Sequence, residues 1–260
     1  MKKFIALLLV LTMALTLFGC GSTDAAQTTV APTEAATEPA TEAATEAATE
    51  APAETEATAT VMTHDEYIAA ELDTEVTVEC YVQATQSWWE DKITVYAQAE
   101  DGAYFIYELA CSEEDAAKLV PGTKIRVTGF KGKWAGEVEI MDATFEFVEG
   151  ETWTAEALDV TELLGTDELI DHQNELVAFT GMTVEAIAYK NDEPGDDIYV
   201  TLSLNGESYD FCVEVYLTGT DSEVYTTVGE LEVGDVVNVE GFLYWYEGVN
   251  PHITAITVAE

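Results

Sequence analysis

The sequence predicts an all-β fold with minor helices, arranged as two tandem five-stranded modules. Three observations lead to this prediction. The run 119–136 is repeated at an offset of 112 residues by the run 231–248. Short stretches that alternate apolar and polar residues predict half-buried strands. Asp101-Gly102 and Asn205-Gly206, strong hairpin turn signals, fall at equivalent places in the two copies.

The first module covers residues 62–148. Thr63 and Glu66 form a capping box, which predicts a short helix through Ala70. The next stretch alternates, so one face of its strand carries Val76, Val78, Cys80 and Val82. Ser112 caps a second short helix that ends near Leu119. The predicted strands are 75–83, 92–99, 103–110, 123–130 and 137–148.

The second module covers residues 166–260 and repeats this order. Helices are predicted at Thr166 and over 224–230. The strands are predicted at 176–184, 197–204, 209–217, 236–244 and 252–258. A connector, 149–165, joins the modules, and its Trp153 is a candidate to pack between them.

A five-stranded Greek-key barrel with a helix after its third strand resembles the OB (oligonucleotide/oligosaccharide-binding) fold. The resemblance includes a Gly-x-x-x-x-Val-x-Gly run from Gly122 to Gly129, repeated from Gly234 to Gly241. The chain looks like the OB-type domains of exported bacterial lipoproteins, many of which have no assigned activity. SH3-like and other small barrels share short strands and glycine turns, and they stay as the alternative.

The first 20 residues read as a lipoprotein signal peptide. Lys2 and Lys3 precede an apolar run, and the run ends in Leu17-Phe18-Gly19-Cys20. This ending resembles a lipobox, which implies that Cys20 is lipidated and anchors the protein to the outer side of the cell membrane. The apolar run is too short for a spanning helix.

Residues 21–61 are nearly all Thr, Glu, Ala and Pro, with eight acids and no bases. Such a segment has almost no apolar surface to bury, so we expect a disordered linker. The whole chain has a formal net charge of −42. Because nucleic-acid affinity rests on Lys and Arg neutralising phosphates, this charge disfavours nucleic acid as a partner.

Aromatic and basic residues gather in the loops expected at one end of each module. The OB resemblance places ligands there. In the first module these candidate ligand-binding residues are Trp88, Trp89, Lys92, Lys131, Lys133 and Trp134; in the second they are Tyr189, Lys190, Tyr244 and Tyr246. Aromatic rings beside cations suit sugar rings or unpaired bases. The same residues also suit a structural role, closing the ends of small barrels.

The sequence indicates no enzyme and no cofactor or metal. His64, His172 and His252 are isolated, and no nucleophile or phosphate-binding motif is present. The acidic loop 191–197 lacks EF-hand spacing, so a solvated turn is favoured over a weak calcium site. A Cys80–Cys111 disulfide and three buried thiols are both compatible with the sequence.

These features favour a non-enzymatic, surface-anchored lipoprotein that binds a ligand, with carbohydrate or wall glycan ahead of nucleic acid. The alternative is a structural or protein-interaction spacer of an envelope assembly. The expected partners are therefore the membrane, through the lipid anchor, and a glycan or an envelope protein.

Overall fold

The computed structural model describes residues 60–259, all of which belong to one compact unit. The signal peptide, Cys20 and the linker lie outside the described residues. No helix in the described range is long and apolar enough to cross a membrane.

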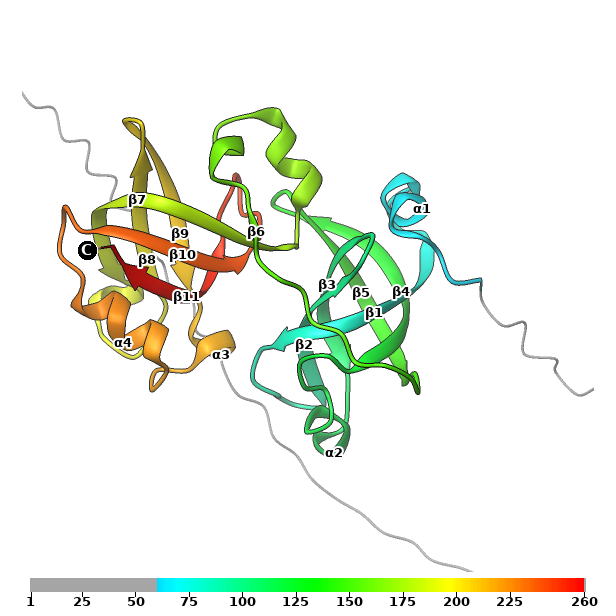
Figure 1. Cartoon of the computed structure of the whole chain (residues 1–260). Helices are drawn as coiled ribbons and strands as arrows, with labels where there is room; N and C mark the ends of the chain where they lie inside the picture. Colours follow the sequence, from blue (N-terminus) through cyan, green and yellow to red (C-terminus); the bar gives the residue numbers. More distant parts are fainter. Residues whose placement is uncertain (1–59, 260) are drawn as a thin grey trace, which may run out of the picture. The chain divides into compact units, whose positions relative to one another are not determined.

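The first five strands close into a barrel with neighbours in the order β1-β2-β3-β5-β4 (Figure 1). They are β1 (Glu75–Thr85), β2 (Lys92–Ala99), β3 (Gly102–Ala110), β4 (Lys124–Trp134) and β5 (Glu137–Phe147). Helix α1 (His64–Ala69) precedes the barrel, and α2 (Glu113–Ala116) lies between β3 and β4. The β3–β5 pair is parallel and the others are antiparallel. This strand order, with the helix after the third strand, makes the barrel OB-like.

The predicted alternation of β1 is confirmed. Its apolar face points into the barrel core and consists of four residues that are each at most 1% exposed: Val76, Val78, Cys80 and Val82. Strand β3 supplies rings to both faces. Tyr104 joins this core, while Phe105 is buried in a separate cluster outside the barrel. The capping box of α1 is also present, because the Thr63 hydroxyl accepts from the Glu66 amide and the Glu66 carboxylate accepts from the Thr63 amide.

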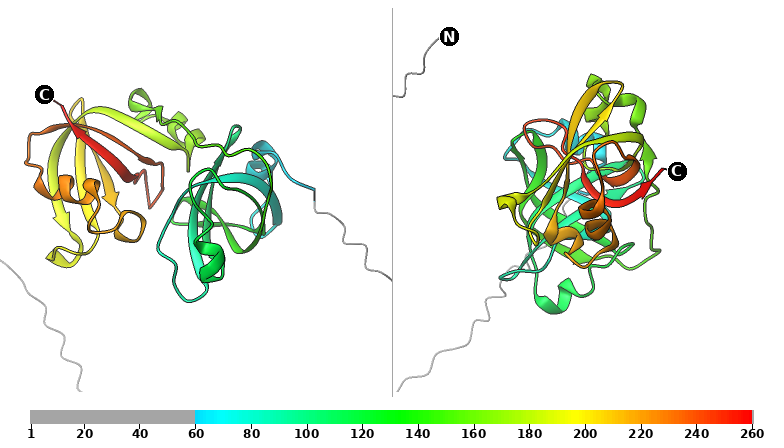
Figure 2. Two further views of the ribbon diagram at one scale, coloured as in Figure 1. Left: turned by 60° about the horizontal axis from the view of Figure 1, so that its bottom comes forward. Right: turned by 90° about the vertical axis from the view of Figure 1, so that its left-hand side faces the viewer.

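A second sheet has the order β10-β11-β9-β8-β7-β6, and β10 also pairs with β7 (Figures 1 and 2). Its strands are β6 (Leu158–Asp159), β7 (Leu176–Tyr189), β8 (Ile198–Leu204), β9 (Glu207–Val213), β10 (Val236–Phe242) and β11 (His252–Val258). The segments that connect these strands contain three 3₁₀ turns: η1 (Thr161–Leu163), η2 (Asp167–His172) and η3 (Lys190–Asp192). They also contain the helices α3 (Val215–Thr218) and α4 (Glu223–Glu230).

The prediction that the strand 209–217 extends to Leu217 is wrong. The strand ends at Val213, and α3 follows it. Glu214 caps α3 because its side chain accepts a hydrogen bond from the Tyr216 amide, and Gly219 ends the helix with a φ of +79°. Local capping therefore overrides the strand propensity of this apolar stretch.

The two glycine runs that repeat at an offset of 112 have a common physical cause. Gly122 and Gly234 adopt φ values of +89° and +101°, which favour glycine. At Gly129, a Cβ would lie 2.8 Å from the Met141 carbonyl oxygen. At Gly241, it would lie 2.1 Å from a backbone oxygen of the facing strand. Both of these later glycines sit at register shifts, where neighbouring backbones approach closely.

Aromatic and hydrogen-bonded contacts join the barrel to the second sheet. Tyr96 stacks on Phe242 with ring centroids 4.6 Å apart, and its hydroxyl lies 2.7 Å from Nδ1 of His252. Glu137 accepts a hydrogen bond from the Trp245 amide at 2.9 Å. Trp153 of the connector packs instead on Tyr81 of β1, so it is not part of this junction.

Candidate functional site

A tight turn between β1 and β2 builds the candidate site. Trp89 and Lys92 pair through two backbone hydrogen bonds of 2.9 Å, with Glu90 and Asp91 between them at φ values of 45° and 64°. Two central residues with positive φ define a type I′ hairpin turn. The turn therefore holds Trp89 in a fixed position at the end of the barrel.

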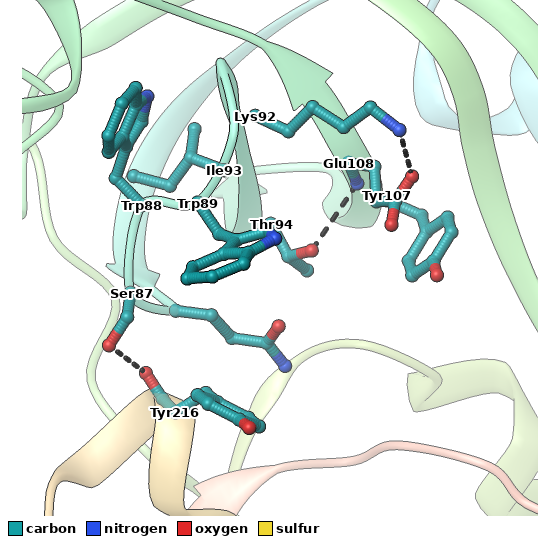
Figure 3. A pocket seen from close by; sticks show the side chains of 10 residues that line it. Ser87, Trp88, Trp89, Lys92, Ile93, Thr94, Tyr107, Glu108 and Tyr216 are labelled. Atoms are coloured by element: carbon teal, nitrogen blue, oxygen red, sulfur yellow. Dashed lines mark hydrogen bonds and ion pairs between the residues drawn. The ribbon is translucent and has the colours of Figure 1, made fainter. Parts of the chain in front are cut away.

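Beside this turn lies a pocket of about 380 Å³ (Figure 3). Trp89, Tyr107 and Tyr216 supply three large rings to its lining, and their exposed fractions are 72%, 43% and 63%. They come from the turn, from β3 and from α3. Other lining residues are Gln86, Ser87, Trp88, Lys92, Ile93, Thr94 and Glu108. Exposed rings grouped around a cavity can stack on a flat ligand.

Trp88 has a different role from its neighbour. Its side chain is half-buried against the barrel core, and its indole N–H donates to the Cys111 carbonyl at 2.8 Å. A tryptophan with its polar atom satisfied inside the protein is a fixed wall of the pocket rather than a mobile contact. Trp88 and Trp89 therefore line the same pocket, one as support and the other as an exposed face.

One ion pair lies at the pocket. Lys92 Nζ donates to Glu108 Oε2 at 2.5 Å, and both side chains are exposed. This hydrogen bond raises the pKa of Lys92 and lowers that of Glu108. The Glu108 amide also donates to Thr94 Oγ1 at 3.3 Å. Both side chains are charged at neutral pH, so the pocket offers donors and acceptors without a net positive charge.

A backbone contact brings α3 to the pocket. The amide of Ser87 donates to the Tyr216 carbonyl at 2.8 Å, and the Ser87 hydroxyl donates to the same oxygen at 3.3 Å (Figure 3). Sequence reasoning missed Tyr216, because the strand predicted there placed it outside any loop. Tyr107 had a usable signal, since alternation separates it from the core residue Tyr104.

The sequence places Trp88, Trp89 and Trp134 at one end of the first module, but only Trp88 and Trp89 line the same pocket. Trp134, 54% exposed, pairs with Tyr246 at a centroid distance of 5.2 Å and does not line the pocket. Lys131 is buried, and its Nζ donates to three carbonyls at the end of α1, so it has a structural role. Lys133 is exposed on β4.

The residues predicted in the second module form two groups, because Tyr244 and Tyr246 line one cavity while Tyr189 and Lys190 do not line it. Tyr189 is half-buried near Tyr225, and Lys190 pairs with Asp197 at 2.9 Å. Tyr244 stacks on His252 with ring centroids 4.2 Å apart. Over residues 60–259, no three His, Cys, Asp or Glu side chains are arranged to hold a metal. The thiols of Cys80, Cys111 and Cys212 are free and buried.

Comparison with known proteins gives structural neighbours only. No protein-family profile matches the chain, and no curated protein matches it. A murine DNA-binding protein bound to double-stranded DNA is 13% identical, with a TM-score of 0.35, and the match covers 71% of this chain and 95% of that one. The HINa domain of Ifi202 with 20-bp double-stranded DNA is 12% identical, with a TM-score of 0.34, covering 72% and 96%. A replication protein A heterotrimer bound to single-stranded DNA is 12% identical, with a TM-score of 0.30, covering 71% and 48%.

These structures correct two sequence-based predictions. The sequence-based ranking of carbohydrate or glycan ahead of nucleic acid, and the expectation that nucleic acid is an unlikely partner, run against these neighbours, whose named ligands are double-stranded or single-stranded DNA. The charge argument considers only one contribution to nucleic-acid binding. Net charge describes affinity for phosphates, whereas stacking on exposed rings depends on local geometry.

Proposed function

We propose that the pocket beside the β1–β2 turn binds an unpaired base of single-stranded nucleic acid by stacking. The observation that carries this proposal is the grouping of three exposed rings, Trp89, Tyr107 and Tyr216, around one cavity. Stacking on aromatic side chains accepts every base, because each has a flat π face. Lys92, Glu108 and Thr94 supply polar groups at the cavity for the edge of the base.

Single strands fit this site better than a duplex. A duplex hides the faces of its bases and is held mainly through its phosphates by Lys and Arg. The single lysine of the pocket is already paired with Glu108. Residues 62–148 carry 18 acids and 6 bases, so phosphate attraction contributes little. The affinity for single-stranded nucleic acid should therefore come from stacking on the aromatic rings of the pocket.

We propose further that the protein is an exported, lipid-anchored binding protein rather than an enzyme. The charged N-terminus and the Leu17-Phe18-Gly19-Cys20 ending support lipidation at Cys20. The chain would then present two tandem OB-like modules outside the cell membrane. The ring β7-β8-β9-β11-β10, which follows the neighbour order of the first barrel, supports the second module.

The test is a fluorescence titration of the full chain with single-stranded oligonucleotides of about eight residues, one series for each base. Stacking is worth about 1–3 kcal/mol per base, so Trp89→Ala should weaken binding by roughly five- to 150-fold. Trp134→Ala is the matched control, because Trp134 is also exposed but lies outside the pocket. Equal effects of the two variants, or no fluorescence change with any oligonucleotide, would refute the proposal.

A further inference from the structure

A second cavity, of about 760 Å³, lies on the outer face of the second sheet. Strands β8, β9 and β11 are neighbours there, since Tyr199 pairs with Cys212 and Cys212 pairs with His252. The segment between β10 and β11 adds Tyr244, Tyr246 and Glu247 to the lining. The volume falls in the range of small-molecule sites. The site proposed for a base does not include any of these residues.

The charged side chains that line this cavity are all acidic. Asp210, Glu214 and Glu247 line it, and its lining includes no lysine or arginine. Within residues 60–259, none of these three carboxylates belongs to an ion pair of the described structure. A concave wall of unpaired carboxylates concentrates cations. An acidic lining alone does not make a site, so the state of Glu214 matters.

Glu214 is a buried acid with an unused acceptor. Its side chain is only 9% exposed, and Oε1 accepts from the Tyr216 amide at 3.3 Å. Oε2 is shielded from solvent, and the described structure gives it no hydrogen-bond partner. A buried carboxylate oxygen without a partner is costly unless a positive charge lies nearby. Glu214 lines the cavity, so a cation bound there would offset the cost of ionising this side chain.

The aromatic rings that line the cavity indicate which kind of cation it would bind. Tyr199 and Tyr246, which are 45% and 49% exposed, line the cavity together with Tyr244, whose ring is stacked on His252. A ring face attracts an ammonium group, and tyrosines beside carboxylates are the usual means of holding one. A metal ion would instead need several oxygen ligands converging at short distance. Among the described residues, no such group of three acids, histidines or cysteines exists.

We propose that this cavity is a binding site for an organic cation, in which an alkylammonium or quaternary ammonium group lies against the tyrosine rings and is balanced by Glu214. The acidic balance of the second half of the chain, 25 acids to 1 base over residues 149–260, would draw such a ligand to it. Cation binding here does not require nucleic-acid binding, although Gln86 lines both cavities and Glu214 caps the helix that carries Tyr216.

Binding of the cation should depend on pH. Burial, together with the charge of Asp197, raises the pKa of Glu214 to about 7, while its backbone hydrogen bonds and Lys190 act in the opposite direction. A bound cation favours the ionised form, so affinity should increase between pH 6 and pH 8 as Glu214 loses its proton. Other titratable groups also surround the site. On the strands they are Tyr96 of β2, Tyr199 of β8, Asp210 and Cys212 of β9, and His252 of β11; in the segment between β10 and β11 they are Tyr244, Tyr246 and Glu247.

Choline chloride is a suitable probe because it is monovalent and quaternary. Its methyl protons can be followed by ligand-observed NMR with the full chain, against sodium chloride at the same ionic strength. We expect Glu214→Gln to weaken binding about tenfold and to abolish its pH dependence. Tyr199→Leu keeps the bulk of the side chain and removes the ring, and it should weaken binding about three- to tenfold. Glu230→Gln, an exposed acid on α4, is the control and should leave binding unchanged.

The acidic N-terminal segment could attract any cation weakly, and the variants separate this effect from the proposed site. Retention of choline binding and its pH dependence in Glu214→Gln would overturn the proposal. The proposal would also be overturned if all three variants changed choline affinity equally, or if sodium displaced choline at equal concentration. Circular dichroism of each variant confirms that a loss of binding reflects the site and not unfolding.

Discussion

Replacing Lys131 by methionine should destabilise the protein substantially. Its Nζ donates to the carbonyls of Tyr67, Ile68 and Ala70 at 2.9, 2.7 and 2.9 Å. It also lies 5.2 Å from the centroid of the Tyr67 ring. These carbonyls belong to the last turn of α1, where helical partners are missing. One cation therefore satisfies the end of a helix whose only buried residue is Tyr67.

The size of the effect follows from two opposing contributions. A hydrogen bond to a charged group is worth about 1.5–3 kcal/mol, and three are lost together. The substitution also removes a buried charge that burial disfavours, as the lowered pKa of Lys131 indicates. We expect a net loss of about 2–4 kcal/mol in the free energy of unfolding. Methionine keeps the apolar stem, so lost packing is a minor part.

Urea denaturation of the full chain measures the loss, and hydrogen exchange locates it in α1. Lys133→Met is the matched control, since Lys133 is exposed two residues further along the same strand. It should change stability by less than about 0.5 kcal/mol. The structural role of Lys131 at the end of α1 would be refuted if both variants were equally stable, or if hydrogen exchange in α1 did not increase in Lys131→Met.

Other consequences of the structure can be measured separately. Burial raises the pKa of Glu137 to about 8, above its unfolded value, so its contribution to stability is full below about pH 4.5 and is lost as the pH rises through 8. In Glu137→Gln the loss of stability over this pH range should be smaller in denaturation curves, and the remainder should include the contribution of Glu214. Gly241→Ala should cost about 2–4 kcal/mol because its Cβ would overlap the facing backbone, whereas Gly248→Ala, with open space around it, should be nearly neutral. For the stacking pocket, the logarithm of oligonucleotide affinity should be almost independent of the logarithm of salt concentration, and a slope steeper than about −2 would indicate phosphate binding instead. Iodoacetamide should label the buried thiols only after unfolding, which mass spectrometry would show at Cys80, Cys111 and Cys212.

Much of the fold could be predicted because local patterns are strong in short strands. The alternation of β1 and the capping box at Thr63 are confirmed where they were expected. The prediction failed where two local preferences compete. Residues 215–217 are apolar and suit a strand, but capping by Glu214 and the positive φ of Gly219 favour a helix.

The candidate site was less predictable, because it depends on contacts between distant segments. Trp89 and Lys92 come from one turn and were found from the sequence. Tyr216 reaches the same pocket from more than a hundred residues away, through hydrogen bonds to Ser87. Lys131 resembled a ligand-binding base, and only its burial against α1 shows a structural role.

The sequence by itself determined the repeated glycines, the strand periodicity and the supply of aromatic rings, because these depend on backbone geometry and on residues close in the chain. Only the tertiary structure decided which rings share a cavity and which carboxylates lack a partner. Trp89 and Trp134 look equivalent along the chain, yet one lines the stacking pocket and the other packs on Tyr246. The physical reason is that strand pairing and burial bring distant residues together, and no local pattern encodes that proximity.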